Sequence, residues 1–289
     1  MSSLRTTPKV RDLVFDVGLH RGQDTDFYLA KGYKVVAFEA DPQNAEFCRK
    51  RFADAIENGR LTIVEGAITE ASKDPTTRFY RNRDHNLWGS NSLDWVFRNE
   101  IYDTAMEQIE VNAVDFGAEM EKHGVPQFMK ADIVGSEVVC LRAMLDFENK
   151  PDYLSIRSEK VIFRNLIYEF DLLEKLGYHE FKAIKQDFER SFASVPDGNG
   201  GRLYEFEEGA SGPIGEDTEG KWRSRDAVIR EYRRIFVKYW LFGDYSYLVQ
   251  TEKGRNFIHT VERVLKRSVP GWYDTHARHS SVTKNDRIG

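Results

Sequence analysis

Two acidic side chains stand near the ends of the first two apolar segments of the chain, where strands would end. Asp16 lies at the end of the segment 13–17, and Glu39, 23 residues further on, follows the segment 33–38. An acid at the second position typically accepts hydrogen bonds from ribose hydroxyls. An acid at the first position would repel a pyrophosphate, but it suits a cation such as the ammonium of an amino acid. A nucleoside joined to an amino acid is S-adenosylmethionine, so the pair predicts a site for that cofactor.

Glycines frame the turn between these acids. Gly18 lets the backbone turn tightly, and Gly22 lets a helix begin close to a ligand, with its free N–H groups facing that ligand. The spacing is Asp-x-Gly-x-x-x-Gly and differs from the Gly-x-Gly-x-x-Gly dinucleotide pattern, because residue 20 is His. We expect His20 to pack on the cofactor. A nicotinamide-dependent enzyme is a further alternative.

Residues that could act on a methyl acceptor follow later segments. Methyl transfer needs the acceptor held in line with the methyl group and, for a hydroxyl, a group that takes its proton. Asp132 follows the segment 127–131 and is the main candidate for that role. Lys130 would lie on the same face of a strand there, because side chains two residues apart share a face. His85 and Glu159 are further catalytic candidates.

Strands and helices alternate along the first half of the sequence. We expect strands at 13–17, 33–38, 61–64, 127–131 and 153–156. We expect helices at 24–31, 42–56, 136–145 and 161–176. This alternation predicts an α/β fold, doubly wound around a mostly parallel sheet. Ligands bind beyond the carboxyl ends of the strands in such folds, which is where Asp16, Glu39 and Asp132 are placed.

The rest of the chain would surround this core. We divide the sequence into a core, residues 1–186, and an extension, residues 187–289. The core carries an irregular insertion, 73–107, over the active-site face, where Trp88 and Asn91 would contact the substrate. The extension begins with a glycine-rich flap, residues 187–224. Helices are expected at 224–241 and 247–266, packed on the core, with an irregular tail after Pro270.

Composition excludes several classes of protein. Apolar residues make up 40% of the chain, which supports a core and excludes global disorder. The net charge is −5, so we expect neither nucleic acid nor an anionic membrane as a partner. No apolar run reaches the roughly 18 residues of a membrane span. The two cysteines, Cys48 and Cys140, fit buried thiols of a cytoplasmic protein. An oligomer is compatible with the sequence.

Three segments together resemble the FkbM family of S-adenosylmethionine-dependent methyltransferases. They are Val14-Phe15-Asp16-Val17-Gly18 with Gly22, Phe38-Glu39-Ala40-Asp41-Pro42, and Met129-Lys130-Ala131-Asp132-Ile133-Val134-Gly135-Ser136-Glu137. The similarity covers residues 12 to 180. It implies a Rossmann-like class I methyltransferase fold, with a seven-stranded sheet whose final strand is reversed. It also implies O-methylation of a sugar or natural product, with S-adenosylhomocysteine as the product.

The resemblance also implies roles for individual residues. Asp16, Gly18 and Glu39 inherit cofactor contacts by position, and Ala40 follows the ribose-binding acid. Ala67 and Ile68 fall where such enzymes contact the adenine. These implied contacts complete the cofactor site that the first two strands predict.

The sequence departs from the family pattern at two positions. The family's fourth-strand motif usually reads Lys-Ile-Asp-Val-Glu-Gly-Ala-Glu, and its first Glu is Val134 here. An acid expected after the fifth strand is Arg157. Arg157 could neutralise Asp132 or bind an acidic substrate in a bidentate manner. Glu159 could pair with Arg157 or ligate a metal, but with two acids missing we expect no metal.

The sequence therefore predicts a methyltransferase that acts on a hydroxyl of a small molecule or glycan. One alternative is a protein that binds S-adenosylmethionine without catalysis, which Val134 and Arg157 support. Another is an N-methyltransferase, because a deprotonated amine needs no strong base.

Overall fold

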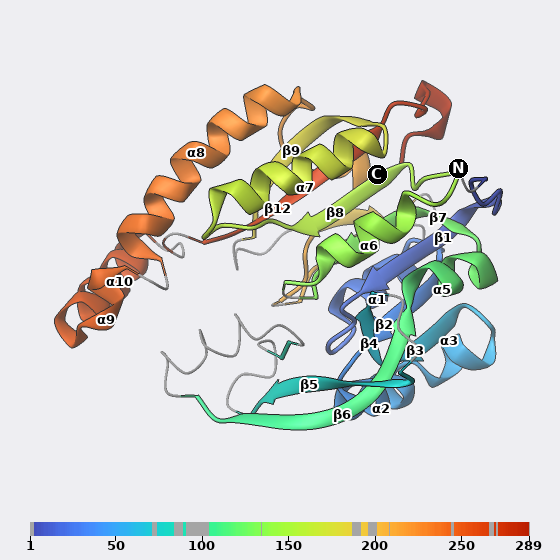
Figure 1. The fold of residues 1–289 in the computed structure, drawn as a ribbon, viewed down its shortest axis with the longest axis horizontal. Helices are drawn as coiled ribbons and strands as arrows, with labels where there is room; N and C mark the ends of the chain where they lie inside the picture. Colours follow the sequence, from blue (N-terminus) through green and yellow to red (C-terminus); the bar gives the residue numbers. More distant parts are fainter. Residues whose placement is uncertain are drawn as a thin grey trace.

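A seven-stranded sheet lies at the centre of the molecule, with strand order β3–β2–β1–β7–β8–β12–β9 (Figure 1). The structure is a computed structural model that describes residues 3–70, 74–83, 89–90, 104–133, 135–186, 192–195, 201–207, 209–243, 246–265, 269 and 271–288. The strands are β1 (Lys9–Val17), β2 (Lys34–Glu39), β3 (Leu61–Glu65), β7 (Val125–Ala131), β8 (Tyr153–Arg157), β9 (Tyr178–Gln186) and β12 (Trp272–His279). In this sheet β12 runs antiparallel to both of its neighbours and the other strands are parallel to one another. The predicted class I methyltransferase fold, with its one reversed strand, is confirmed.

The five strands that the sequence predicts all lie in this sheet. Parallel strands are buried on both faces, and they therefore read as apolar runs. Every residue of β7 is buried, as are the last five of β1 and of β2. The carboxyl ends of these strands share one edge, so Asp16, Glu39 and Asp132 lie at that edge as expected.

The expectation of an irregular tail after Pro270 is wrong. Residues 272–279 form β12, which is inserted between β8 and β9, so the sheet contains eight residues of the predicted extension. Polar residues of β12, among them Thr275 and His276, are buried, and no apolar run marks the strand. Partners on neighbouring elements satisfy them: Ser158 bonds Thr275 at 2.6 Å, and Ser155 bonds His276 at 3.3 Å. Strand β9 also has no counterpart among the predicted strands.

Helices cover both faces of the sheet (Figure 1). They are α1 (Gln23–Ala30), α2 (Pro42–Arg51), α3 (Ala53–Glu57), α5 (Phe116–His123), α6 (Glu137–Met144), α7 (Phe163–Lys175), α8 (Arg225–Phe242), α9 (Tyr247–Gln250) and α10 (Glu252–Leu265). Helices α5, α6, α7 and α8 pack with Phe15 in one apolar cluster, whereas α1 and α2 pack with Val14 in another. Because neighbouring residues of a strand point to opposite faces, the two clusters are the two sides of the sheet.

The helices differ from prediction in two places. The helix expected at 42–56 is interrupted at Phe52, and the one expected at 247–266 is interrupted at Thr251. Helix α8 buries the side chains of Val228, Tyr232 and Ile235 in the core, as an amphipathic packing helix would. Within the described ranges, no helix combines the length and the apolar character needed to cross a bilayer.

A side sheet occupies part of the segment 73–107, which was expected to be irregular. Its order is β4–β6–β5, with β4 (Ala67–Thr69), β5 (Thr76–Asn82) and β6 (Met106–Asp115). Strands β5 and β6 form a long antiparallel ribbon, so this expectation is wrong for their part of the insertion. Most of their residues are at least partly exposed, and no buried-strand pattern marks them. His85, Trp88, Asn91 and Val134 lie outside the described residues.

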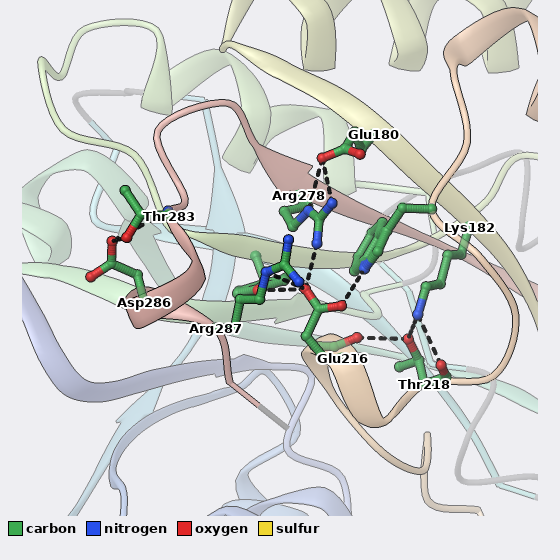
Figure 2. Close-up of polar contacts among 11 residues, drawn as sticks. Glu180, Lys182, Glu216, Thr218, Arg278, Thr283, Asp286 and Arg287 are labelled. Atoms are coloured by element: carbon green, nitrogen blue, oxygen red, sulfur yellow. Dashed lines mark hydrogen bonds and ion pairs between the residues drawn. The ribbon is translucent and has the colours of Figure 1, made fainter.

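The glycine-rich segment is tied to the amino ends of β8 and β9. Arg278 of β12 donates hydrogen bonds to Glu180 and to Glu216, each at 2.6 Å. Lys182 donates to the carbonyl and hydroxyl oxygens of Thr218 at 2.8 and 2.7 Å (Figure 2). Arg278 pairs with Tyr153, the first residue of β8. This network therefore lies at the edge of the sheet opposite to the carboxyl ends of β1 and β2.

Candidate cofactor and acceptor site

The turn after β1 needs glycine at two positions. Gly18 has a φ of +105°, and a Cβ there would lie 2.3 Å from the Asp132 carbonyl oxygen. Gly22 has a φ of +82°, and a Cβ there would lie 2.3 Å from Cε2 of Phe52. The Gly18 N–H donates to the Phe38 carbonyl at 3.1 Å. The turn thus packs directly against the ends of β2 and β7. This close packing leaves no space for a side chain at the two glycine positions.

Asp16 is fully buried at the end of β1. Its Oδ2 accepts a hydrogen bond from the Thr25 hydroxyl at 2.6 Å. Its Oδ1 accepts no hydrogen bond from the described residues, although the Lys130 ammonium lies 3.9 Å away. Burial raises the pKa of Asp16 to about 6. A buried carboxylate oxygen without a hydrogen bond is a place that a cationic ligand group would complete.

Lys130 serves as a fixed cation beneath the turn. Its ammonium lies 2.6 Å from Oδ2 of Asp24. The Asp24 carboxylate also accepts the Ser211 N–H at Oδ1 and the Ser211 hydroxyl at Oδ2. Burial alone would lower the pKa of Lys130, but the carboxylates of Asp24 and Asp16 raise it above its ordinary value. Lys130 therefore stays charged, and this contact does not favour the catalytic role predicted for it.

Glu39 faces the turn from the end of β2. Its Oε2 accepts the His20 N–H at 2.7 Å, and its Oε1 accepts the Asp41 N–H at 2.8 Å. His20 has a φ of 49°, so a non-glycine residue holds the left-handed conformation that presents this N–H. Burial raises the pKa of Glu39 to about 7. Each carboxylate oxygen has two lone pairs, so both can still accept a ribose hydroxyl.

Small apolar residues lie next to Glu39. Ala40 packs against a cluster of Ala67, Phe79 and Val111. Ile68 instead packs in the main core, where it is 4% exposed. Of the two residues predicted to contact the adenine, the structure brings Ala67 close to Ala40 and turns Ile68 into the core.

An open cavity of about 450 Å³ adjoins the same edge. Its lining consists of Arg21, Asp41, Gln43, Asn44, Arg81, Asn82, Arg83 and Glu107. Arg81 binds Asp41 in a bidentate manner, at 2.6 and 2.7 Å. Because the Asp41 N–H donates to Glu39, the cavity begins beside the acid predicted to hold the ribose. Sequence reasoning gave no role to the lining residues 81–83 and Glu107, since β5 and β6 were not predicted.

Asp132 and Arg157 form an ion pair across the ends of β7 and β8. Arg157 Nη1 lies 2.9 Å from Asp132 Oδ1, and its guanidinium carbon lies 3.8 Å from the centre of the Trp272 ring. Burial alone would raise the pKa of Asp132, but Arg157 and Lys130 lower it below its ordinary value. Of the two roles predicted for Arg157, this contact corresponds to the neutralisation of Asp132. The lowered pKa makes Asp132 a weaker base than its position suggested.

Two buried acids near this pair were not among the predicted site residues. Asp274 of β12 is 4% exposed, and burial raises its pKa to about 8. Glu137, at the start of α6, is 5% exposed, and burial raises its pKa to about 7. Asp274 could be found only by recognising β12, whereas Glu137 stands in the fourth-strand motif and could have been singled out there.

Glu159 binds backbone groups of the turn that follows it. Its Oε1 accepts the backbone N–H groups of Lys160, Val161 and Ile162, at 2.7, 2.6 and 3.2 Å. These bonds fix the turn before α7, so the contacts explain its residue type without a role in catalysis or metal binding. The described residues contain no group of three His, Cys, Asp or Glu arranged to hold a metal ion.

Comparison with known proteins gives one family and several more distant similarities. Residues 16–180 match the methyltransferase FkbM domain. A protein named probable ribosomal RNA small subunit methyltransferase A, from Haloquadratum walsbyi, is 34% identical over 74 residues, which are 26% of this chain and 25% of that protein. The match thus spans a quarter of the relative's length.

Solved structures show low similarity over most of the chain. The precorrin-6Y C5,15-methyltransferase of Geobacter metallireducens aligns with 96% of this chain and 84% of its own, at 11% identity and a TM-score of 0.35. A SAM-dependent methyltransferase of Archaeoglobus fulgidus aligns with 92% of this chain and 85% of its own, at 12% identity and a TM-score of 0.35.

The FkbM match covers more than half of the chain and includes Asp16, the glycine turn, Glu39 and Asp132. These residues lie together at one edge of a sheet with the reversed strand that the family fold implies. The chain therefore belongs to the FkbM family of S-adenosylmethionine-dependent methyltransferases.

Proposed function

We propose that this methyltransferase acts on a hydroxyl of a small molecule, such as a sugar or a natural product. The observation that carries the cofactor half of the proposal is the placement of Asp16 and Glu39 on either side of the turn 18–22. Asp16 keeps a buried oxygen that accepts no hydrogen bond from the described residues. The family resemblance supports a hydroxyl acceptor. A net charge of −5 argues against a polyanionic acceptor such as RNA.

The residues around the turn fit the three parts of S-adenosylmethionine. Asp16 accepts a hydrogen bond from the ammonium of the amino-acid part, and Glu39 accepts the ribose hydroxyls. Ala40 and Ala67 provide a flat apolar wall for the adenine, because neither side chain projects far. The bound cofactor supplies an electrophilic methyl group. The chain has to orient the acceptor toward it and exclude water.

The acceptor side lies over the ends of β7, β8 and β12. Asp132 and Arg157 hold each other at 2.9 Å, and Trp272 holds Arg157 in turn. We assign this pair a positioning role, because the lowered pKa of Asp132 leaves it a poor proton acceptor. A fixed ion pair at the strand ends gives an acceptor hydroxyl one orientation.

Calorimetric titration tests the cofactor half of the proposal. The unsubstituted protein should bind S-adenosylmethionine and S-adenosylhomocysteine but not NAD. Glu39→Ala and Asp16→Asn should each weaken binding by about tenfold or more, since each removes a charge-assisted hydrogen bond. Glu57→Ala, at an exposed acid of α3, is the matched control and should bind normally. Binding of NAD alone, or of none of the three, would overturn the proposal.

Transfer of a labelled methyl group tests the acceptor half. Sugars and other hydroxylated small molecules should accept the label, while matched amines and RNA should not. Labelling of amines alone would make the chain an N-methyltransferase. Cofactor binding with no transfer to any acceptor would favour a cofactor-binding protein without catalysis.

A further inference from the structure

Buried charges at the carboxyl edge of the sheet do not balance. The acids are Asp16, Asp24, Asp132 and Asp274, and the cations are Lys130, Arg157 and Lys160. These groups come from α1, β1, β7, β8, β12 and the turn before α7, and each interacts electrostatically with others in the set. Within this set the acids outnumber the cations by one, and the buried carboxyl of Glu137, which interacts with Asp132 and Arg157, adds a further acid. A buried site with an excess negative charge must bind either a cation or a proton.

Three of the four acids have partners that stabilise their charge. Asp24 lies 2.6 Å from the Lys130 ammonium, and Asp132 lies 2.9 Å from Arg157. Asp16 accepts the Thr25 hydroxyl at 2.6 Å and faces Lys130 at 3.9 Å. A proton placed on any of these acids would weaken a favourable contact.

Asp274 differs from the other three. Its Oδ2 accepts a hydrogen bond from the neutral amide of Gln186 on β9 at 3.0 Å. Within the described part of the chain, no cation lies at ion-pair distance from it. It sits opposite Arg157 in the β8–β12 register, but Arg157 is bonded to Asp132. Asp274 is therefore the acid of this group whose charge is least stabilised.

We propose that Asp274 exchanges a proton in response to the charge of the bound cofactor: it is ionised while a sulfonium cofactor is bound and protonated when the neutral sulfide product replaces it. The inference rests on the proposed cofactor site. S-adenosylmethionine carries one net positive charge, and S-adenosylhomocysteine carries none. The positive charge of the first offsets one excess negative charge, whereas the second leaves that charge for a proton to neutralise.

This exchange links cofactor choice to pH. Burial raises the pKa of Asp274 to about 8, so at neutral pH the carboxyl is mostly protonated before a ligand binds. Binding of the cationic cofactor must then release a proton, and its affinity should fall about tenfold for each pH unit below that pKa. Affinity for the neutral product should not carry this dependence. Methylation of a hydroxyl also liberates one proton. Asp274 takes up one proton when the cofactor becomes the product, so the two numbers match.

Glu137 is the nearest rival for this proton. It is buried at the start of α6 and interacts with Asp132 and Arg157. Its Oε2 accepts the Gly135 N–H at 2.9 Å. A substitution at each acid therefore separates the two assignments.

Titration calorimetry near neutral pH, in two buffers of different ionisation enthalpy, counts the protons released on binding each ligand. The unsubstituted protein should release close to one more proton with S-adenosylmethionine than with S-adenosylhomocysteine. The ammonium and carboxylate are common to both ligands, so their effects cancel in this difference. Asp274→Asn should abolish the difference and Glu137→Gln should keep it.

Equal proton counts in the unsubstituted protein, or a difference that survives in Asp274→Asn, would overturn the inference alone. Loss of the difference in Glu137→Gln but not in Asp274→Asn would also overturn it. Failure of both ligands to bind would overturn the proposed function together with the inference. If Asp274→Asn does not fold, infrared difference spectra of the unsubstituted protein decide the question. The protonated carboxyl band should be stronger with the product than with the cofactor, and equal bands would refute the proposal.

Discussion

The guanidinium of Arg157, at the end of β8, donates a hydrogen bond to the Asp132 carboxylate, at the end of β7, over 2.9 Å. The two residues belong to neighbouring parallel strands, and the ring of Trp272 covers Arg157 from β12. Because the Arg157 guanidinium is bonded to Asp132, it does not stabilise the other acids at this edge. The interaction therefore decides which carboxyl groups of the site can exchange a proton.

Replacing Arg157 should change how stability depends on pH. The folded-state pKa of Asp132 lies below its ordinary value, so its carboxylate stabilises the fold above that value and the contribution is lost as pH falls through the folded pKa. Arg157→Met should cost about 1–3 kcal/mol at neutral pH. The cost should shrink as the pH falls below the ordinary aspartate pKa of about 3.9 and through the lower folded-state pKa of Asp132. Urea unfolding over this pH range measures it.

Arg230 provides the control for this substitution. It is an exposed arginine on α8, and Arg230→Met should leave the free energy of unfolding nearly unchanged at every pH. Equal costs for the two variants, or a cost for Arg157→Met that does not vary with pH, would contradict the assigned interaction.

The turn at Gly18 should tolerate no side chain. Gly18→Ala places a Cβ 2.3 Å from the Asp132 carbonyl oxygen and also forces alanine to a φ of +105°. Gly32→Ala meets a similar φ of +95° with no atom within 4 Å of the added Cβ. The conformational cost should be similar, on the order of 1–2 kcal/mol, so any excess in Gly18→Ala measures the clash. Thermal unfolding and cofactor titration of both variants test this: only Gly18→Ala should lose cofactor binding.

The residues of the proposed cofactor site could be singled out in the sequence because their signals are local. Asp16 and Glu39 come at the ends of apolar runs, and the turn glycines lie between them. Parallel strands place such residues at one edge of the sheet whatever the rest of the chain does. The predicted class I methyltransferase fold followed from the same alternation of strands and helices, together with the family resemblance.

The proposed acceptor side depends on contacts between distant segments. Asp274 lies in a strand whose polar residues are buried only because Ser155, Ser158 and Gln186 supply partners for them. Apolar residues do not alternate regularly along such a strand. Its sequence pattern therefore predicts a loop. The pairing of Arg157 with Asp132 likewise depends on the β7–β8 alignment, and sequence reasoning left it as one of two alternatives.

Glu216 should anchor the glycine-rich segment to the sheet. Its carboxylate accepts hydrogen bonds from Tyr153 and Trp222 at 2.9 Å and from Arg278 at 2.6 Å. Glu216→Ala leaves these donors without their acceptor and should cost about 2–4 kcal/mol. Limited proteolysis should then cut residues 209–222 faster than in the unsubstituted protein. Glu219→Ala, at a neighbouring exposed acid, should change neither quantity. Unchanged proteolysis of Glu216→Ala would show that other contacts hold the segment.

His276 should make the fold sensitive to acid. Burial, together with the nearby charge of Lys182, lowers the pKa of His276 to about 3. Between that value and the ordinary histidine pKa of about 6.5, the unfolded chain binds a proton that the folded chain excludes. Stability therefore falls as pH falls through this window, by about 1.4 kcal/mol per pH unit for this one group.

His276→Gln removes this dependence and keeps a group that can bond to the Ser155 hydroxyl, which lies 3.3 Å from the His276 Nε2. The variant should lose less stability than the unsubstituted protein between about pH 6.5 and pH 5, by roughly 2 kcal/mol. His179→Gln, at an exposed histidine of β9, should retain the full acid sensitivity. Urea unfolding at the two pH values compares all three proteins. Parallel losses in all three would mean that His276 accepts a proton without cost, and that the β8–β12 interface admits charge more readily than its burial implies.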